Sequence, residues 1–325
     1  MNVKQVANIF QERDNFLIIT HQRPDGDAIG STLGLLEALR ENGKKADAFF
    51  HEELPCAYLE LISTPYLIEK LPCLGDYDNI ICLDFSNPKR FGDVDLSAFN
   101  TINIDHHPDN SRFGKDNFIY PRAAATAEII FNIVNSIKTW NINIKAATYM
   151  LMGVIMDTGG LRFDNTSASV LTCAAELLKA GAEHSRIVNS LFYSKPKNIA
   201  EMEADIVLHH LQSEFNGKFA WFYMSDELLD SYGVSEKDTE GLIDVLRELK
   251  GVEIAAIFRK KDEGFRFSLR SKNKKYSVGA IARALNGGGH ELAAGGFIQT
   301  AYIDEAEKIM MDYVKNEFSK DRMSI

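Results

Sequence analysis

Short apolar runs alternate with amphipathic stretches along the first half of the chain. Four brief, nearly continuous apolar runs are typical of strands buried on both faces: 16–20, 45–50, 79–84 and 101–105. Apolar residues at helical spacing predict helices over 3–10, 33–42, 124–138, 144–156 and 167–180. Short buried strands that alternate with helices predict an α/β domain with a doubly wound, mainly parallel sheet.

The pattern changes after about residue 185. Residues 197–212 form a polar helical stretch with few core-sized side chains, which we expect to connect two domains. Beyond it the pattern predicts strands over 218–224 and 252–259, a hairpin into 265–270, and helices over 240–250 and 277–286. We therefore predict a domain over 1–190, a connecting helix or linker over 191–215 with a hinge near 185–215, and a smaller C-terminal α/β domain over 216–325.

Composition narrows the classes of partner and compartment. The chain has 36 basic and 46 acidic residues, a net charge of −10, which argues against binding long nucleic acid by bulk electrostatics. The longest apolar stretch, 146–156, is too short to span a bilayer, and the charged N-terminus lacks an export signal. Four scattered cysteines without C-x-x-C spacing fit a reducing cytoplasm, where we expect this protein.

Polar side chains capable of metal binding follow the first predicted strand. His21, Asp25 and Asp27 supply one imidazole and two carboxylates from a single turn, and Gly26 allows that turn to be tight. Asp25 or Asp27 could instead cap the helix that follows. Taken alone, this segment leaves capping and metal binding about equally favoured.

Three later segments also end in acids or imidazoles. Asp84 closes an apolar strand, where a turn into Ser86-Asn87-Pro88 is the simpler interpretation when the segment is taken alone. Asp105-His106-His107 closes the next strand, and three consecutive ligand-type side chains favour a metal site. Asp157 ends an apolar helix, where its charge opposes the helix dipole unless a cation lies nearby; the alternative is a helix stop made by the glycines that follow.

The combined donor set indicates hard or borderline divalent ions. Carboxylates with a few imidazoles and no cysteine suit Mn²⁺ or Mg²⁺ and exclude a cysteine-rich structural zinc site. Four carboxylates exceed the needs of one ion, so we predict two. A pair of such ions binds a phosphoryl group and makes water nucleophilic at neutral pH.

The four segments, in this order, resemble the DHH phosphoesterase superfamily. The segments are THQRPDGDAIG, NIICLD, NIDHH and MDTGG. The C-terminal region resembles the DHHA1 domain through 266–271, 287–290 and 293–296, and the whole chain looks most like the stand-alone nanoRNase and pAp-phosphatase proteins. Two departures, Asn286 for a glycine and Ala127 for a serine in a Thr-Ser-Glu stretch, are expected to touch no metal position.

The resemblance implies roles for the residues of the first domain. One Mn²⁺ would be bound by His21 and Asp25 and a second by Asp27, His106 and Asp157, with Asp84 bridging the two; Mg²⁺ or another divalent ion is the alternative. Asp105 would orient a ligand imidazole. His107 would lie near the scissile phosphate or its leaving group.

The resemblance also implies a substrate clamp in the second domain. Arg270 and His290 would hold the terminal phosphate or base of the substrate, since a guanidinium can bind phosphate through two hydrogen bonds. Ser271 lies beside Arg270 and is included in the clamp. Backbone N–H groups of Gly287, Gly288 and Gly289 could surround an anion, although a flexible loop is the plainer interpretation.

The activity that these features imply is phosphoester hydrolysis. The favoured function is degradation of very short RNA and removal of the 3′-phosphate of 3′-phosphoadenosine 5′-phosphate (pAp). Cyclic di-AMP or its linear product is an alternative substrate, and a RecJ-like exonuclease or a non-catalytic nucleotide-binding regulator is less favoured. We expect short RNA or small nucleotides as partners, no membrane and no long nucleic acid; the sequence leaves the oligomeric state open, a homodimer included.

Overall fold

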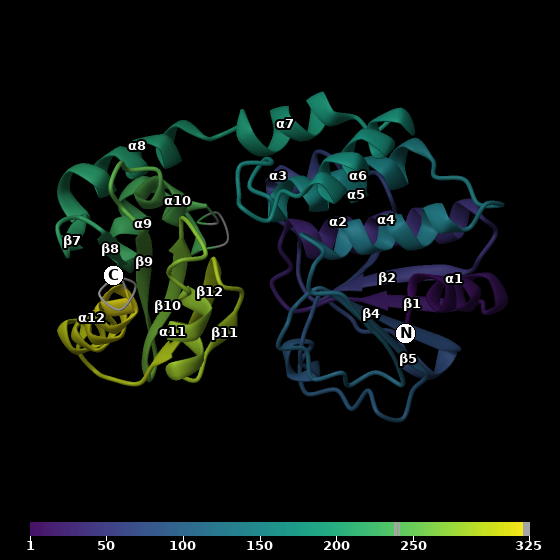
Figure 1. The fold of residues 1–325 in the computed structure, drawn as a ribbon, viewed down its shortest axis with the longest axis horizontal. Coiled ribbons are helices and arrows are strands. Elements are labelled where there is room, and N and C mark those ends of the chain that lie inside the picture. The colour runs from purple at the N-terminus through teal and green to yellow at the C-terminus, as the bar shows by residue number, and fades with distance from the viewer. Residues whose placement is uncertain (237–238, 240, 321–325) are drawn as a thin grey trace. The chain divides into compact units, whose positions relative to one another are not determined.

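The computed structural model describes residues 1–236, 239 and 241–320. It divides into two compact units, Met1–Ser194 and Lys195–Ile325, and each is built around a six-stranded sheet (Figure 1). Within the described residues, no helix is both long enough and apolar enough to cross a bilayer.

The sheet of the first unit is parallel throughout, as predicted. Its order is β3-β2-β1-β4-β5-β6. The strands are β1 (Phe16–Ile19), β2 (Ala46–Phe50), β3 (Leu67–Ile68), β4 (Asn79–Leu83), β5 (Thr101–Asp105) and β6 (Asp116–Ile119). The chain runs outward from β1 to β3 and then returns to β4 beside β1. Parallel sheets bind ligands at such a reversal, outside the carboxyl ends of the strands.

Helices cover one face of this sheet. They are α1 (Val3–Glu12), α2 (Gly26–Glu41), α4 (Thr126–Ser136), α5 (Ile144–Asp157), α6 (Ala168–Lys179) and α7 (His184–Phe192), with a single turn at α3 (Cys56–Leu59). In Figure 1, α2 and α4 lie next to the strands, with α5 and α6 beyond them.

Loops and single turns cover the opposite face. The turns are η1 (Leu74–Asp76) and η2 (Pro88–Arg90). Phe85 and Phe91 from this region pack on Leu17 and Cys82 of the sheet. The fold class is therefore as predicted, whereas this face lacks the long helices of a doubly wound fold because the connections after β3 and β4 contain only single turns.

Glycines allow α2 and α5 to pack closely. A Cβ atom on Gly30 would lie 2.5 Å from the carbonyl oxygen of Tyr149, and one on Gly153 would lie 2.8 Å from Oδ1 of Asp27. A Cβ on Gly26, the first residue of α2, would meet the side chain of Met156 near the end of α5. The start of α2 and the end of α5 are thereby brought together.

Replacing Gly30 with Ala is expected to destabilise the first unit by about 1–3 kcal/mol, because the added methyl group overpacks two helix backbones. Urea unfolding monitored by circular dichroism measures the change. Gly75→Ala is a matched control, since the nearest atom to its Cβ would be Sγ of Cys73 at 3.8 Å. Equal unfolding midpoints for the two variants would contradict the close-packing interpretation.

The second unit contains a mixed sheet of order β11-β12-β10-β9-β8-β7. Its strands are β7 (Gln212–Glu214), β8 (Phe219–Met224), β9 (Ile254–Lys261), β10 (Gly264–Ser271), β11 (Gly288–Gly289) and β12 (Ala293–Ile298). β8 and β9 are parallel, and the other neighbours are antiparallel.

Helices pack on both faces of the second sheet. One face carries α11 (Val278–Ala284) and α12 (Ile303–Ser319), and the other carries α8 (Lys197–Asp205), α9 (Asp226–Tyr232) and α10 (Leu242–Arg247). The helices α7, α9 and α12 were not predicted from the sequence, and β12 was identified there only as a motif. Residue 240, the first of the helix expected over 240–250, lies outside the described residues.

The segment expected to connect the domains packs into the second unit. α8 continues into one π-helical turn, η3 (Ile206–His210). Met202 and Ile206 are fully buried beside Ala220 and Phe222 of β8. The apparent shortage of core residues was misleading, because two apolar side chains four positions apart are enough to anchor a short helix. The domain limits of 1–190, 191–215 and 216–325 stay a prediction.

Candidate metal centre

The acids and imidazoles of the first unit gather at one edge of its sheet. His21 follows β1, Asp84 follows β4, and His106 follows β5, and these three strands are neighbours. The N-terminus of α2 and the C-terminus of α5 reach the same edge. The sequence-distant segments therefore meet beside the reversal in strand order.

Among the groups of three side chains whose ligand atoms lie within 4.8 Å of one another, two contain the expected ligands. The groups are His21, Asp25 and Asp84, and Asp27, His106 and Asp157. They adjoin, because Nε2 of His106 lies 3.5 Å from Oδ1 of Asp84. These are the six side chains that the resemblance implied as ligands, with Asp84, the expected bridge, in the group of His21 and Asp25.

Backbone carbonyls fix the tautomers of the two imidazoles. Nδ1 of His21 donates to the carbonyl of Gln22 at 2.8 Å, and Nδ1 of His106 donates to the carbonyl of Ala123 at 3.3 Å. Each Nε2 is therefore left with its lone pair, and that of His106 lies 3.2 Å from Oδ2 of Asp157. Burial lowers the pKa of both rings, that of His106 to about 4. Neutral rings with this tautomer are suited to metal binding.

The carboxylates of Asp27 and Asp84 are buried next to other acids. Burial and the charge of Asp25 raise the pKa of Asp27 to about 7, and burial and Asp27 raise the pKa of Asp84 well above its usual range. Burial disfavours the protonated form of His21 and His106 beside them. Crowded acids in a buried site are unfavourable unless cations join them, so the donor set fits two divalent ions.

Asp84 has a left-handed backbone conformation, with φ of +63°. Asp and Asn tolerate this region better than other residues that carry a Cβ atom, although it is still sparsely populated. The sequence pattern alone favoured an ordinary turn here. The strained conformation instead accompanies a side chain that is 1% exposed and lies between both donor groups.

Asp25 and Asp27 cap helices as well as joining the donor groups. Oδ1 of Asp25 accepts from the backbone N–H groups of Asp27 and Ala28 at 3.1 and 3.0 Å. Asp27 instead caps α4, accepting from the N–H groups of Thr126 at 2.5 Å and Ala127 at 2.9 Å. The capping and metal-binding interpretations of this segment are therefore compatible.

Asp105 binds a different imidazole from the one expected. Its Oδ1 accepts from Nδ1 of His107 at 2.7 Å and from the backbone N–H of His106 at 2.8 Å. The ring of His106 is held by Ala123 instead. Although burial acts in the opposite sense, Asp105 raises the pKa of His107, and His107 lowers that of Asp105. This pair therefore favours a protonated His107.

Sequence reasoning missed two residues at this centre. Oγ1 of Thr126 donates to Oδ1 of Asp84 at 2.9 Å. The available signal was the Thr-x-Glu pattern at the start of a predicted helix. Arg90 was overlooked in the turn after β4; after burial, its positive charge is the main influence that lowers the pKa of His21.

In the second unit, β12 joins the two principal residues of the expected clamp. Arg270 pairs with Ala293 of β12, and the carbonyl of Ala293 accepts from the N–H of His290 at 2.7 Å. Ser271 is 1% exposed, and its hydroxyl donates to the carbonyl of Asn273 at 2.8 Å. The hydroxyl of Ser271 thus stabilises a turn, and we remove this residue from the clamp.

The glycines before His290 are required by strand packing rather than by a flexible loop. A Cβ on Gly287 would lie 2.2 Å from the carbonyl oxygen of Gly295, and one on Gly289 would lie 2.6 Å from that of Ala293. Asn286 has φ of +59°, a conformation that asparagine tolerates. Its departure from glycine is therefore compatible with the local backbone.

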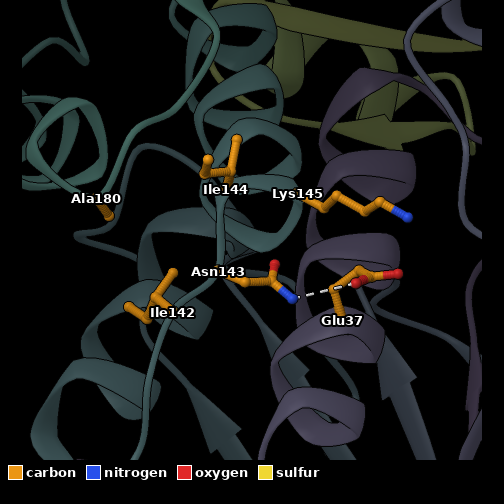
Figure 2. A pocket seen from close by; sticks show the side chains of 6 residues that line it. All are labelled: Glu37, Ile142, Asn143, Ile144, Lys145 and Ala180. Carbon is orange, nitrogen blue, oxygen red and sulfur yellow. Dashed lines mark hydrogen bonds between the residues drawn. The ribbon is translucent and has the colours of Figure 1, made fainter.

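A separate hollow lies at the opposite end of α5 from Asp157 (Figure 2). Its lining includes Glu37, Asn143, Ile144 and Lys145, and Nδ2 of Asn143 donates to Glu37 at 3.3 Å. No metal-type cluster includes these side chains among the residues that the structure describes. The candidate donor groups lie at the other end of the helix, around Asp157.

Known proteins share both units. Residues 15–154 match the DHH family, N-terminal domain, and residues 216–316 match the DHHA1 domain. The chain is 33% identical to the "Bifunctional oligoribonuclease and PAP phosphatase NrnA" of Thermus thermophilus, covering 93% of this chain and 90% of the relative. It is 30% identical to the protein of the same name from Bacillus subtilis, covering 92% and 93%.

A solved structure has the same fold. The exopolyphosphatase-related protein from Bacteroides fragilis superimposes with a TM-score of 0.85 at 23% identity, covering 97% of this chain and 95% of that one. The family matches and the sequence relatives show that the chain belongs to the DHH family and carries a DHHA1 domain in its second unit.

Proposed function

We propose that this protein is a metal-dependent phosphoesterase that degrades very short RNA and removes the 3′-phosphate of pAp to give AMP. The observation that carries the proposal is the pair of adjoining donor groups, with Asp84 next to both. Proteins 33% and 30% identical over nearly the whole chain are named for these two activities. Both substrates present a phosphoester close to a chain end, which suits a site without a long basic track.

The six donors would hold two Mn²⁺ ions, which supply a nucleophilic hydroxide and neutralise charge on the phosphoryl oxygens. His21 and His106 would bind through Nε2, because each Nδ1 donates to a backbone carbonyl. Asp84 would bridge the two positions. Carboxylate and imidazole donors suit Mn²⁺ and also accept Mg²⁺, so the identity of the ion is part of the proposal.

His107 would donate the proton that the leaving oxygen needs. Asp105 binds its Nδ1 at 2.7 Å and stabilises the imidazolium form. The proton on Nε2 of that imidazolium would pass to the oxygen released from phosphorus, and the ring would regain a proton from water. We place this chemistry in the cytoplasm, where the scattered cysteines would stay reduced.

A single substrate panel tests the proposal. Purified protein with Mn²⁺ is incubated with pAp, dinucleotide to pentanucleotide RNA, long RNA and cyclic di-AMP, and products are separated by chromatography. We expect AMP from pAp, mononucleotides from short RNA, and slow attack on long RNA. No turnover by metal-loaded protein would show the proposal to be wrong, and fastest turnover of cyclic di-AMP would favour the alternative substrate.

Replacing Arg270 with Ala is expected to raise KM about 10- to 100-fold while leaving kcat close to normal, because one charge-assisted hydrogen bond to phosphate is lost. Lys274→Ala is a matched control, since Lys274 is an exposed cation of the same basic segment. Steady-state kinetics on pAp separates the two parameters. A fall in kcat alone would remove Arg270 from the clamp.

A further inference from the structure

One short segment contacts members of both donor groups. Residues 123–128, which lead into α4, provide four hydrogen bonds to three of the six candidate ligands. The partners are Nδ1 of His106, both carboxylate oxygens of Asp27, and Oδ1 of Asp84.

The segment is itself held rigidly from outside the centre. Glu128 is 2% exposed, and its carboxylate accepts from the N–H of Ala124 at 2.8 Å and from the hydroxyl of Ser169 at 2.5 Å. Ser169 belongs to α6, so the carboxylate joins the segment to a neighbouring helix. A rigid support of this kind limits the orientations open to the groups that it contacts.

Within the segment, the hydroxyl of Thr126 has the most specific contact. Thr126 is fully buried, and its Oγ1 donates to Oδ1 of Asp84 at 2.9 Å. That bond uses one lone pair of one oxygen and leaves Oδ2, which lies 4.0 Å from Nε2 of His21. The bond therefore sets the rotation of the one carboxylate that adjoins both groups.

We infer that Thr126 is a positioning residue that orients Asp84 for binding both ions, with segment 123–128 as the frame of the centre. The inference rests on the proposed function for the presence of metal. It gives a role at the metal centre to a residue that is not one of the six donors. Partners that orient ligands contribute about 10- to 100-fold to metal affinity or activity.

The test compares Thr126→Val, which keeps the shape and removes the hydroxyl, with Thr126→Ser, which keeps the donor. Isothermal titration calorimetry with MnCl₂ gives the number of ions and their Kd values without using substrate. We expect the valine variant to bind at least one ion about 10- to 100-fold more weakly than wild type, and the serine variant to bind close to normally. For pAp we expect kcat to fall in the valine variant and KM to stay near normal.

Thr32→Val is the matched control. Thr32 is fully buried on α2, and its hydroxyl has no hydrogen-bond partner among the described residues. The same chemical change there should leave Mn²⁺ affinity unchanged. Should Thr126→Val fail to fold in a metal-free thermal scan, Thr126→Ala takes its place, and serine must then recover the affinity that alanine loses.

The outcomes separate this inference from the proposed function. Equal Mn²⁺ affinity in wild type and Thr126→Val, or equal losses in the valine and serine variants, would overturn the role of the hydroxyl while leaving the phosphoesterase proposal intact. A wild-type protein that binds no Mn²⁺ would overturn both. Tight Mn²⁺ binding without hydrolysis of any panel substrate would overturn only the proposed function.

Discussion

Replacing Asp84 with Asn is expected to reduce pAp hydrolysis about 1,000-fold, because a bridging carboxylate contributes several kcal/mol of charge stabilisation in the transition state. Asn retains the size of the side chain and tolerates the left-handed backbone, so the fold should persist. Calorimetry should show that the variant has lost high-affinity binding of at least one Mn²⁺. Steady-state kinetics and metal titration together measure the effect.

Two comparisons make this prediction specific. Asp84→Ala should be as inactive and also less stable, because alanine has no local hydrogen bond to support φ of +63°. Asp95→Asn changes an exposed acid in a loop and should leave activity normal. Turnover by Asp84→Asn within about tenfold of wild type would contradict a bridging role.

Removing metal with EDTA is expected to abolish hydrolysis, and adding Mn²⁺ back should restore it. Binding should also stabilise the folded protein, by about 2.7 kcal/mol at 100 times Kd, since the unfolded chain does not assemble the six donors. For a unit of this size that corresponds to a rise in Tm of roughly 5–10 °C. Differential scanning fluorimetry of stripped and reloaded protein measures the shift. Full activity after exhaustive chelation would exclude the two-ion mechanism.

The same removal should reveal a pH dependence caused by the buried acids. The pKa of Asp27 is raised from 3.8 to about 7 in the folded protein. Between these two pH values the folded state therefore keeps a proton that the unfolded chain has lost. Its stabilising contribution is present below about pH 4 and is lost as the pH rises through about 7. The pKa of His106 is lowered from 6.5 to about 4. Its contribution to the stability of the fold is therefore lost as the pH falls below 6.5, in the opposite sense to that of Asp27.

Urea midpoints of the EDTA-treated protein should therefore fall as the pH rises from about 6.5 to about 8. Asp27→Asn removes one of the titrating groups and should reduce this fall. Saturating Mn²⁺ should also reduce it, because the bound ions compensate the carboxylates. If the urea midpoint of the metal-free protein rises over this pH interval, the raised pKa of Asp27 in the folded state is wrong.

The parallel sheet could be predicted from local sequence because its signals are local, whereas the candidate donors were proposed from their combined pattern and from the family resemblance. Continuous apolar runs at 16–20 and 79–84 mark buried strands whatever packs on them. Elements with weak local signals were missed: β11 is two glycines, and its pairing with β12 depends on close backbone contact rather than side-chain pattern. α12 was missed although Ala306, Met310 and Val314 recur at helical spacing.

The sequence by itself determined which strands end in acids or imidazoles and which types of donor atom they carry. Both depend on residues close together in the chain. Only the tertiary structure decided which carboxylate adjoins which imidazole and that Asp27 caps a helix about a hundred residues away. It also decided that Asp105 binds His107 and that Thr126 donates to Asp84. Those contacts depend on how close α2, α4 and α5 approach one another. That distance is set by glycines at helix crossings, whose partners no local pattern reveals.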